Sequence, residues 1–306
     1  MDISRFNQPL SWEHTRLMIS KIVQAIFLIV FTNSVAFAKL SIITTTANLK
    51  SITEEIGGHN VDVTSFCKGT QDPHYLEARP SYMVKTSRAN LIISIGLGLE
   101  VGWLPKVISG ARNQKVMPGK IGYLEVGKLI SLLEVPKGPV TRADGDIHPE
   151  GNPHVDLDPI RAGEIGEHIA KRLSKIDPLN GTFYHSKAMA LKERLVAKTV
   201  EWKKRISKSG NRKVVTHHKT LTYFVDRFGV KVPAILEPFP GISPTAPHVL
   251  TVIKTSSREG VKLILVESYF DSSVAQRVAR DVPGVRVTSV PVSVGGRMDI
   301  KRIDDV

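Results

Sequence analysis

The sequence predicts an α/β protein of two lobes, each a mainly parallel sheet flanked by helices, joined by a long rigid helix. Two observations point to this fold class. Apolar strand-like runs alternate with helical segments in both halves of the chain, as in parallel sheets with helices on both faces. Between the halves, from Asp158 to about Ser209, the helical pattern is longer than an average helix and strand patterns are almost absent. This arrangement predicts a cleft between the carboxyl ends of the two sheets.

The first half of the chain carries the elements of one lobe. The run "KLSIITTTANLKSITEEIGG" (39–58) is typical of a strand, a turn and a helix that ends at two glycines. "NVDVTSFC" (60–67) alternates between apolar and polar residues as a half-buried strand does. A helix is expected from Pro80, followed by a fully apolar strand at Leu91–Ile95 and a glycine-rich turn into another helix.

The second half repeats this alternation after a helical middle. "FYHSKAMALKERLVAKTVEWKKRISK" (183–208) has helical periodicity and predicts the linking helix. "KVVTHHKTLTYFVDRFGV" (213–230) predicts a strand followed by a helix that ends at Gly229. "VKLILVES" (261–268) and "VRVTSVPVSVGG" (285–296) predict two further strands.

These elements predict four segments. The chain has 306 residues, of which 42% are hydrophobic, and this is enough for one large or two modest domains. The predicted segments are an N-terminal extension with a cleaved signal peptide (1–38), an N-terminal α/β lobe (39–158), linking helices (159–208) and a C-terminal α/β lobe that is short at its end (209–306).

The composition argues against a nucleic-acid-binding protein. The formal net charge is +13, but the lysines and arginines are scattered through every segment. Binding to nucleic-acid phosphates needs clustered basic residues, and no helix-turn-helix, zinc-finger or other recognition motif is found. The charge is therefore interpreted as a basic, solvated surface, and no nucleic acid is expected as a partner.

A cleaved secretory signal peptide is predicted near the N-terminus. Arg16 and Lys21 flank the start of a short apolar block, Ile22–Phe31, and Ala36-Phe37-Ala38 offers the small residues that signal peptidase accepts. The block is about half the ~20 residues needed to span a bilayer. We expect cleavage after Ala38 and a mature periplasmic chain that does not span the membrane. No cysteine lies at the cleavage point, so a lipid anchor is not indicated.

Several of the ten histidines fall where a predicted strand ends and a helix begins. His74 lies between a predicted strand and the helix that begins at Pro80. His154 lies just before a helix that is expected to begin with an Asp-Pro pair, and His217 and His218 follow a strand. Because the carboxyl ends of parallel strands share one edge of a sheet, both halves of the chain can direct imidazoles into one cleft.

Imidazoles at these positions favour a zinc site. Cys67 is the only cysteine, so a metal ion has to be held by imidazole and carboxylate groups. Imidazole nitrogen suits Zn²⁺, and the nearby carboxylates of Asp72, Asp156 and Asp158 can orient the rings. For a single histidine, capping or packing at a loop is the simpler interpretation. Three histidines at matching junctions favour a shared ion.

One further histidine lies in an acidic loop. The run "DGDIHPEGNPH" (144–154) surrounds His148 with Asp144, Asp146 and Glu150. This group is interpreted as a plain polar loop, with low-affinity contact with a cation as the alternative.

Four ordered motifs resemble one protein family. "DPHYLEARPSYMVKTSRANLIISIGLGLE", "GNPHVDLDP", "VVTHHKTLTYFVDRFGV" and "EPFPGISPT" follow the predicted signal. They are similar to the zinc-type solute-binding proteins of zinc and manganese ABC transporters (metal-binding cluster A-I), from about Leu40 to Gly296. The resemblance implies a monomeric periplasmic receptor without catalytic activity. Such a receptor binds one metal ion between its lobes and delivers it to a membrane permease with a cytoplasmic ATPase.

The family pattern also implies three ligands. By motif position they are His74, His154 and His218, because the third ligand follows "VT" by two positions and is therefore not His217. Manganese members have a glutamate at this third position. A histidine there favours Zn²⁺ as the bound ion over Mn²⁺.

The fourth ligand departs from the family pattern. The family places an aspartate after the last strand, where "SVPVSVGGRMD" has Ser293 and Val294. We expect Glu267 to take its place, because it ends a buried strand that faces the cleft. Water, Glu237 and Asp299 are the alternatives.

Two other functions remain open at this point. Three ligands with an open fourth position are also typical of zinc hydrolases, but HExxH, a nucleophile elbow and a P-loop are absent from the sequence. A metal-binding adhesin on the same fold is the second alternative.

Overall fold

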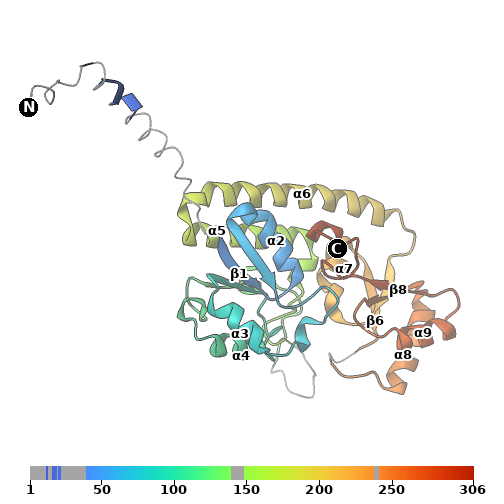
Figure 1. Ribbon diagram of the computed structural model, residues 1–306. Coiled ribbons are helices and arrows are strands. Elements are labelled where there is room, and N and C mark those ends of the chain that lie inside the picture. Colours follow the sequence, from blue (N-terminus) through green and yellow to red (C-terminus); the bar gives the residue numbers. More distant parts are fainter. Residues whose placement is uncertain (1–11, 13–15, 19, 22–38, 139–147, 238–240) are drawn as a thin grey trace, which may run out of the picture. The chain divides into compact units, whose positions relative to one another are not determined.

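The computed structural model describes residues 12, 16–18, 20–21, 39–138, 148–237 and 241–306 (Figure 1). The predicted signal block Ile22–Phe31 and its cleavage point after Ala38 lie outside these residues. Met1–Ala38 and Lys39–Val306 are separate units, and the fold below is that of the second unit. Among the described residues, none of the helices combines the length and the apolar character that crossing a bilayer requires.

Two four-stranded parallel sheets form the framework of this unit. The first has the order β2-β1-β3-β4, with β1 at Leu40–Thr44, β2 at Val61–Ser65, β3 at Leu91–Ser94 and β4 at Tyr123–Glu125. The second has the order β6-β5-β7-β8, with β5 at Lys213–Thr216, β6 at Lys231–Ile235, β7 at Leu263–Glu267 and β8 at Arg286–Val290. The predicted fold class is confirmed.

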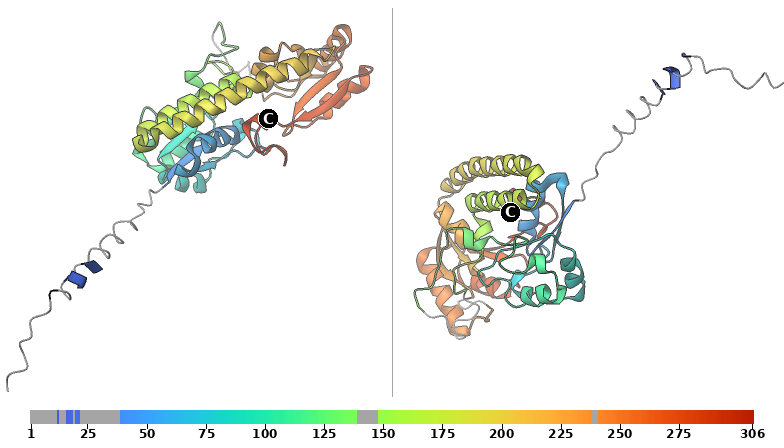
Figure 2. Two further views of the ribbon diagram at one scale, coloured as in Figure 1. Left: turned by 90° about the horizontal axis from the view of Figure 1, so that it is seen from above. Right: turned by 90° about the vertical axis from the view of Figure 1, so that its left-hand side faces the viewer.

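Helices surround both sheets. In chain order they are α2 (Ala47–Gly57), α3 (Pro80–Ser87), α4 (Leu104–Ala111), α5 (Pro159–Ile176), α6 (Gly181–Ser207), α7 (Thr222–Phe228), α8 (Ala246–Glu259) and α9 (Ser273–Asp281). The predicted long helix is α6, with 27 residues, which runs alongside α5 and reaches from the first sheet to the second (Figures 1 and 2).

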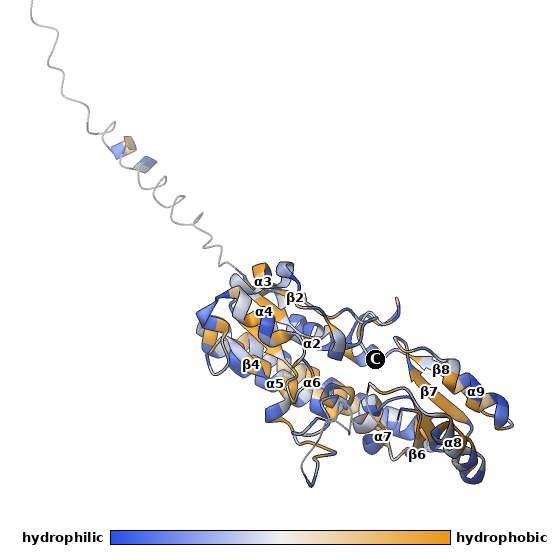
Figure 3. Ribbon diagram, turned by 90° about the horizontal axis from the view of Figure 1, so that it is seen from below, coloured by the Kyte–Doolittle hydropathy of each residue, from blue (hydrophilic) through white to orange (hydrophobic). Residues whose placement is uncertain are grey.

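Burial explains why the strands are apolar. All four residues of β3 are buried, because the core that contains α2, α5 and α6 residues covers one face of the first sheet and the core around α4 covers the other. In the second sheet β7 is a hydrophobic segment (Figure 3), and its inward side chains pack with residues of α8 and α9. Each half therefore has its own hydrophobic core.

A buried carboxylate joins the linking helices to the second half. Asp158 is fully buried and caps α5 by accepting a hydrogen bond from the backbone N–H of Ile160 at 2.9 Å. It also accepts hydrogen bonds from Arg161 and, at 2.9 and 2.6 Å, from Arg227 of α7. Its predicted role in orienting a histidine is wrong, because its oxygens bind these guanidinium groups and the cap.

A second connection lies beside the C-terminal end of β8. Asn48 of α2 is 3% exposed, and its amide donates to the carbonyl of Val292 at 3.2 Å and accepts from the N–H of Val294 at 2.8 Å. A Cβ on Gly69 would lie 2.1 Å from the carbonyl oxygen of Val294, so only glycine allows the two loops to touch through their backbones. The segment where the family pattern places an aspartate is thus bonded to α2.

Candidate metal centre

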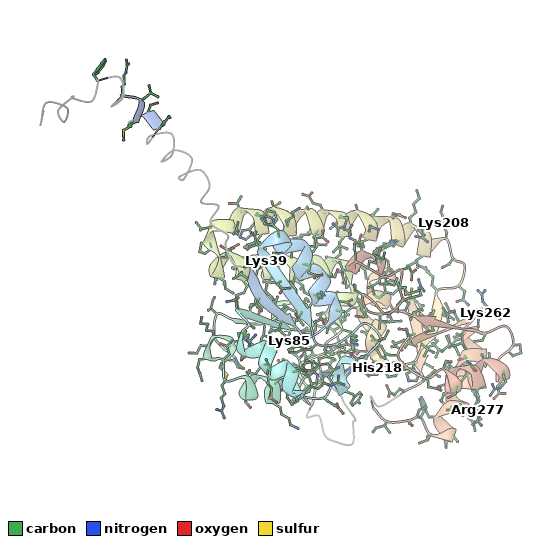
Figure 4. All side chains as sticks on the ribbon, viewed as in Figure 1. Lys39, Lys85, Lys208, His218, Lys262 and Arg277 are labelled. Atoms are coloured by element: carbon green, nitrogen blue, oxygen red, sulfur yellow. The ribbon has the colours of Figure 1, made fainter. Side chains whose placement is uncertain are left out.

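Three short turns at the carboxyl ends of the sheets hold the predicted histidines. His74 lies in a 3₁₀ turn at Pro73–Tyr75, after β2. His154 precedes a similar turn that leads into α5, and His218 lies two residues after the end of β5 and precedes a third turn. Figure 4 places His218 where the two halves of the unit meet. One ligand atom from each of the three histidines lies within 4.8 Å of the other two.

The mutual orientation of the rings suits a shared ion. The ring planes of His74 and His218 are 82° apart, and those of His154 and His218 are 89° apart, with centroids separated by 5.8 and 5.7 Å. Three atoms within 4.8 Å of one another have a common point at most about 2.8 Å from each. Zinc is bound by histidine nitrogen at about 2.0–2.1 Å. Inward shifts of less than about 1 Å would therefore complete three bonds.

A carboxylate orients His74. Asp72 accepts a hydrogen bond from Nδ1 of His74 at 2.6 Å and another from its backbone N–H at 2.9 Å. Burial alone raises the pKa of Asp72, but the hydrogen bond and charge of His74 outweigh this effect and hold the pKa below its usual value. Trp103 donates to the carbonyl of Pro73 at 2.9 Å and supports the same turn. With Nδ1 occupied in this way, Nε2 of His74 is the nitrogen available to an ion.

His218 is oriented in the same way from the second half. Its Nδ1 donates to Glu237 at 2.8 Å, and the other oxygen of Glu237 accepts from the backbone N–H of Gly241 at 2.9 Å. The neighbouring His217 instead stacks on Phe270, with ring centroids 4.6 Å apart. Glu237, an alternative for the fourth ligand, thus binds the Nδ1 side of His218 and orients that ring.

We expect Glu237→Gln to weaken Zn²⁺ binding about 10- to 100-fold. The neutral amide makes the imidazole of His218 a weaker base and holds its tautomer less firmly. Competition with a chelating dye measures the affinity. Glu259→Gln is the control, because Glu259 is paired with Lys213 near the other end of β5. Equal affinities of Glu237→Gln and the unmodified chain would contradict this role.

His154 has the properties expected of a metal ligand. Its side chain is 6% exposed, and its Nε2 has no hydrogen-bond partner among the described residues. Burial lowers the pKa of the His154 imidazole well below its usual range, and the neighbouring histidines lower it further. The ring is therefore neutral and can donate its lone pair. Because buried polar atoms are rarely left unpaired, this nitrogen fits a metal ion.

The predicted fourth ligand is not part of this group. Glu267 ends β7 and is fully buried, but the group of donor atoms within 4.8 Å, searched over the described residues, does not include it. Burial raises its pKa and favours the neutral acid. Asp299 is exposed and paired with Arg297. The assignment of Glu267 as a metal ligand stays a prediction.

His148 lies beside His74, whereas the sequence favoured a plain polar loop and left low-affinity contact with a cation as the alternative. Its Nε2 is 3.1 Å from Nε2 of His74, and the two ring centroids are 5.2 Å apart. Asp156 was expected to orient a histidine, but no bond between it and a histidine is found among the described residues. Burial raises the pKa of Asp156 to about 6.

Comparison with known proteins gives consistent results. The family model described as "Zinc-uptake complex component A periplasmic" matches residues 42–299. The metal ABC transporter substrate-binding lipoprotein ScbA of Streptococcus cristatus is 27% identical over 260 residues, covering 83% of this chain and 78% of that protein. The manganese ABC transporter substrate-binding lipoprotein PsaA of Streptococcus pneumoniae is 27% identical over 259 residues, with coverage of 83% and 78%. A crystal structure of ZnuA has a TM-score of 0.72 at 23% identity, covers 84% of this chain and 93% of its own, and is similar in fold.

Proposed function

We propose, from the premise that this chain belongs to the family of periplasmic zinc-uptake complex component A proteins, that it captures Zn²⁺ for import. Members of this family are metal-binding, substrate-binding proteins of ABC transporters, so the resemblance found in the sequence is confirmed. Family membership also identifies the chain as a transport component and not an enzyme, which removes the hydrolase alternative.

The choice of zinc is supported by one observation, the convergence of three imidazoles. The group of His74, His154 and His218 contains nitrogen donors only, within the part of the chain that the structure describes. Nitrogen ligands suit Zn²⁺, whereas Mn²⁺ favours oxygen ligands. The relative PsaA is named for manganese, and in the family pattern manganese proteins carry a glutamate where this chain has His218.

Carboxylates behind the ligands support a divalent ion. Asp72 and Glu237 each accept a hydrogen bond from Nδ1 of a ligand candidate, and their side chains are largely buried. Two such carboxylates offset the charge of a divalent ion that is held by neutral rings.

The rest of the transport role is proposed from family membership and the predicted signal peptide. After cleavage behind Ala38, the mature chain would act as a monomer in the periplasm and deliver Zn²⁺ to a membrane permease with its cytoplasmic ATPase. A metal-binding adhesin would use the same ion, but its deletion would impair attachment without causing zinc starvation.

Titration of the metal-free chain tests the proposal. We expect one Zn²⁺ per chain in calorimetry, and Zn²⁺ should displace Mn²⁺ in competition, in keeping with the preference of imidazole donors. His218→Ala should remove most of this binding, while His217→Ala, altered at the adjacent position, should retain it. No uptake of Zn²⁺, or a preference for Mn²⁺, would contradict the proposal.

A further inference from the structure

Two imidazole nitrogens face each other at the edge of the metal centre. Nε2 of His148 and Nε2 of His74 are 3.1 Å apart, and their rings are tilted by 30°. Two ring nitrogens at this distance either share a proton or bind one cation. Tetrahedral ligands bound at about 2.0–2.1 Å lie about 3.3–3.4 Å apart. The observed separation is therefore close to that of two ligands on one zinc ion.

The backbone beside His148 leaves room for its ring. Gly98 has φ +86°, and a Cβ at this position would lie 3.2 Å from Nδ1 of His148. Most side chains are strained at such a φ, and the added carbon would press on the imidazole. Glycine at position 98 thus allows His148 to approach His74.

Among the described residues, the group of converging donors contains no carboxylate. The segment after β8 has Ser293 and Val294, and the N–H of Val294 is bonded to Asn48. Glu267 is buried and lies outside the group of converging donors in the described part of the chain. Within the described part of the chain, His148 is an additional imidazole in contact with that group, through His74.

We propose, on the basis of the zinc-capture function above, that His148 is the fourth metal ligand and that the ion is held by four imidazoles. His148 binds through Nε2, with its proton on Nδ1, and the ion takes the place of the proton between the two rings. Its donor atom is not within 4.8 Å of all three others. Metal binding therefore draws the ring inward by a side-chain rotation.

This ligand set has a consequence for selectivity. Four neutral imidazoles add no negative charge, so Asp72 and Glu237 behind the rings supply the compensation. An all-nitrogen set disfavours Mn²⁺, which is bound best by oxygen. Loss of His148 would leave its position to a water oxygen.

X-ray absorption at the zinc edge tests the ligand directly. The Zn²⁺-loaded chain should show four imidazole ligands, and His148→Ala should show three with one additional oxygen. The affinity of His148→Ala for Zn²⁺ should fall about 10- to 100-fold. His185→Ala is the control, because His185 is an exposed histidine on α6.

A pair of glycine variants tests whether the space beside Gly98 is needed for the position of the His148 ring. Gly98→Ala should also weaken Zn²⁺ binding, because its added carbon displaces the His148 ring. Gly119→Ala is the matched control, since Gly119 has a similar φ of +83° but a Cβ there meets no atom within 4 Å. Circular dichroism of the metal-free variants verifies that they are folded.

The outcomes separate this inference from the function on which it rests. If the unmodified chain binds no Zn²⁺, both are overturned. If it binds Zn²⁺ but His148→Ala retains the affinity and the number of nitrogen ligands, only the role of His148 is overturned. The same holds if Glu267→Gln, and not His148→Ala, changes the coordination.

Discussion

The variant His154→Ala is expected to lower the affinity for Zn²⁺ by about a hundredfold or more. Nε2 of His154 is buried, lacks a hydrogen-bond partner among the described residues, and belongs to the group of converging donors. A four-ligand zinc site contributes about 10–16 kcal/mol, or roughly 3 kcal/mol for each ligand. Since about 1.4 kcal/mol is a factor of ten, the loss of one ligand corresponds to about a hundredfold.

Competition with a chelator of known affinity measures this loss, and thermal unfolding of the metal-free chain separates it from misfolding. Alanine at position 154 removes a buried nitrogen that lacks a partner, and this offsets part of the cost of the cavity. The metal-free variant should therefore remain folded. His168→Ala, on α5, is the control. Unchanged zinc affinity of His154→Ala would show that the three histidines do not share an ion.

The variant Asp158→Ala is expected to lower the free energy of unfolding by about 3–5 kcal/mol. Asp158 is fully buried and accepts hydrogen bonds from the guanidinium groups of Arg161 and Arg227. Its removal leaves Arg161, which is also buried, without its carboxylate partner and deprives α5 of its cap.

Urea unfolding of the metal-free chain measures this effect. Asp158→Asn keeps an oxygen for the cap but loses the charge, so it should be intermediate between the alanine variant and the unmodified chain. Asp299→Ala is the control, because Asp299 pairs with Arg297 on an exposed loop and its loss should change stability little. Equal unfolding free energies of Asp158→Ala and the unmodified chain would contradict the structural role assigned to Asp158.

Local patterns were sufficient to predict the sheets and the positions of three histidines. Buried parallel strands are apolar runs, and such runs are found at β3 and β7. The ends of parallel strands lie at one edge, so the sequence positions of His74, His154 and the pair His217–His218 predicted imidazoles in one cleft. The choice of His218 from that pair came from the family resemblance. Adjacent residues on an extended chain point to opposite sides, which explains why His217 packs on Phe270 while His218 faces the site.

Contacts between residues that are distant in the sequence could not be predicted from local patterns. Glu237 lies 19 residues from its partner His218, and Arg227 lies 69 residues from Asp158. Neither pair forms a motif, because register and loop path decide which side chains meet. His148 lies 74 residues from His74, and its polar neighbours in the sequence gave no indication of that contact.

The bonds of Asn48 across the two halves bear on how an ion is chosen. When a receptor closes around its ligand, part of the binding free energy is spent on that conformational change. An ion that fits poorly can then be rejected because closure remains incomplete. Here Asn48 of the first half is bonded to Val292 and Val294 of the second half. We infer that these bonds restrict the relative motion of the two halves, and that discrimination among ions depends on the electronic preference of the coordinating atoms.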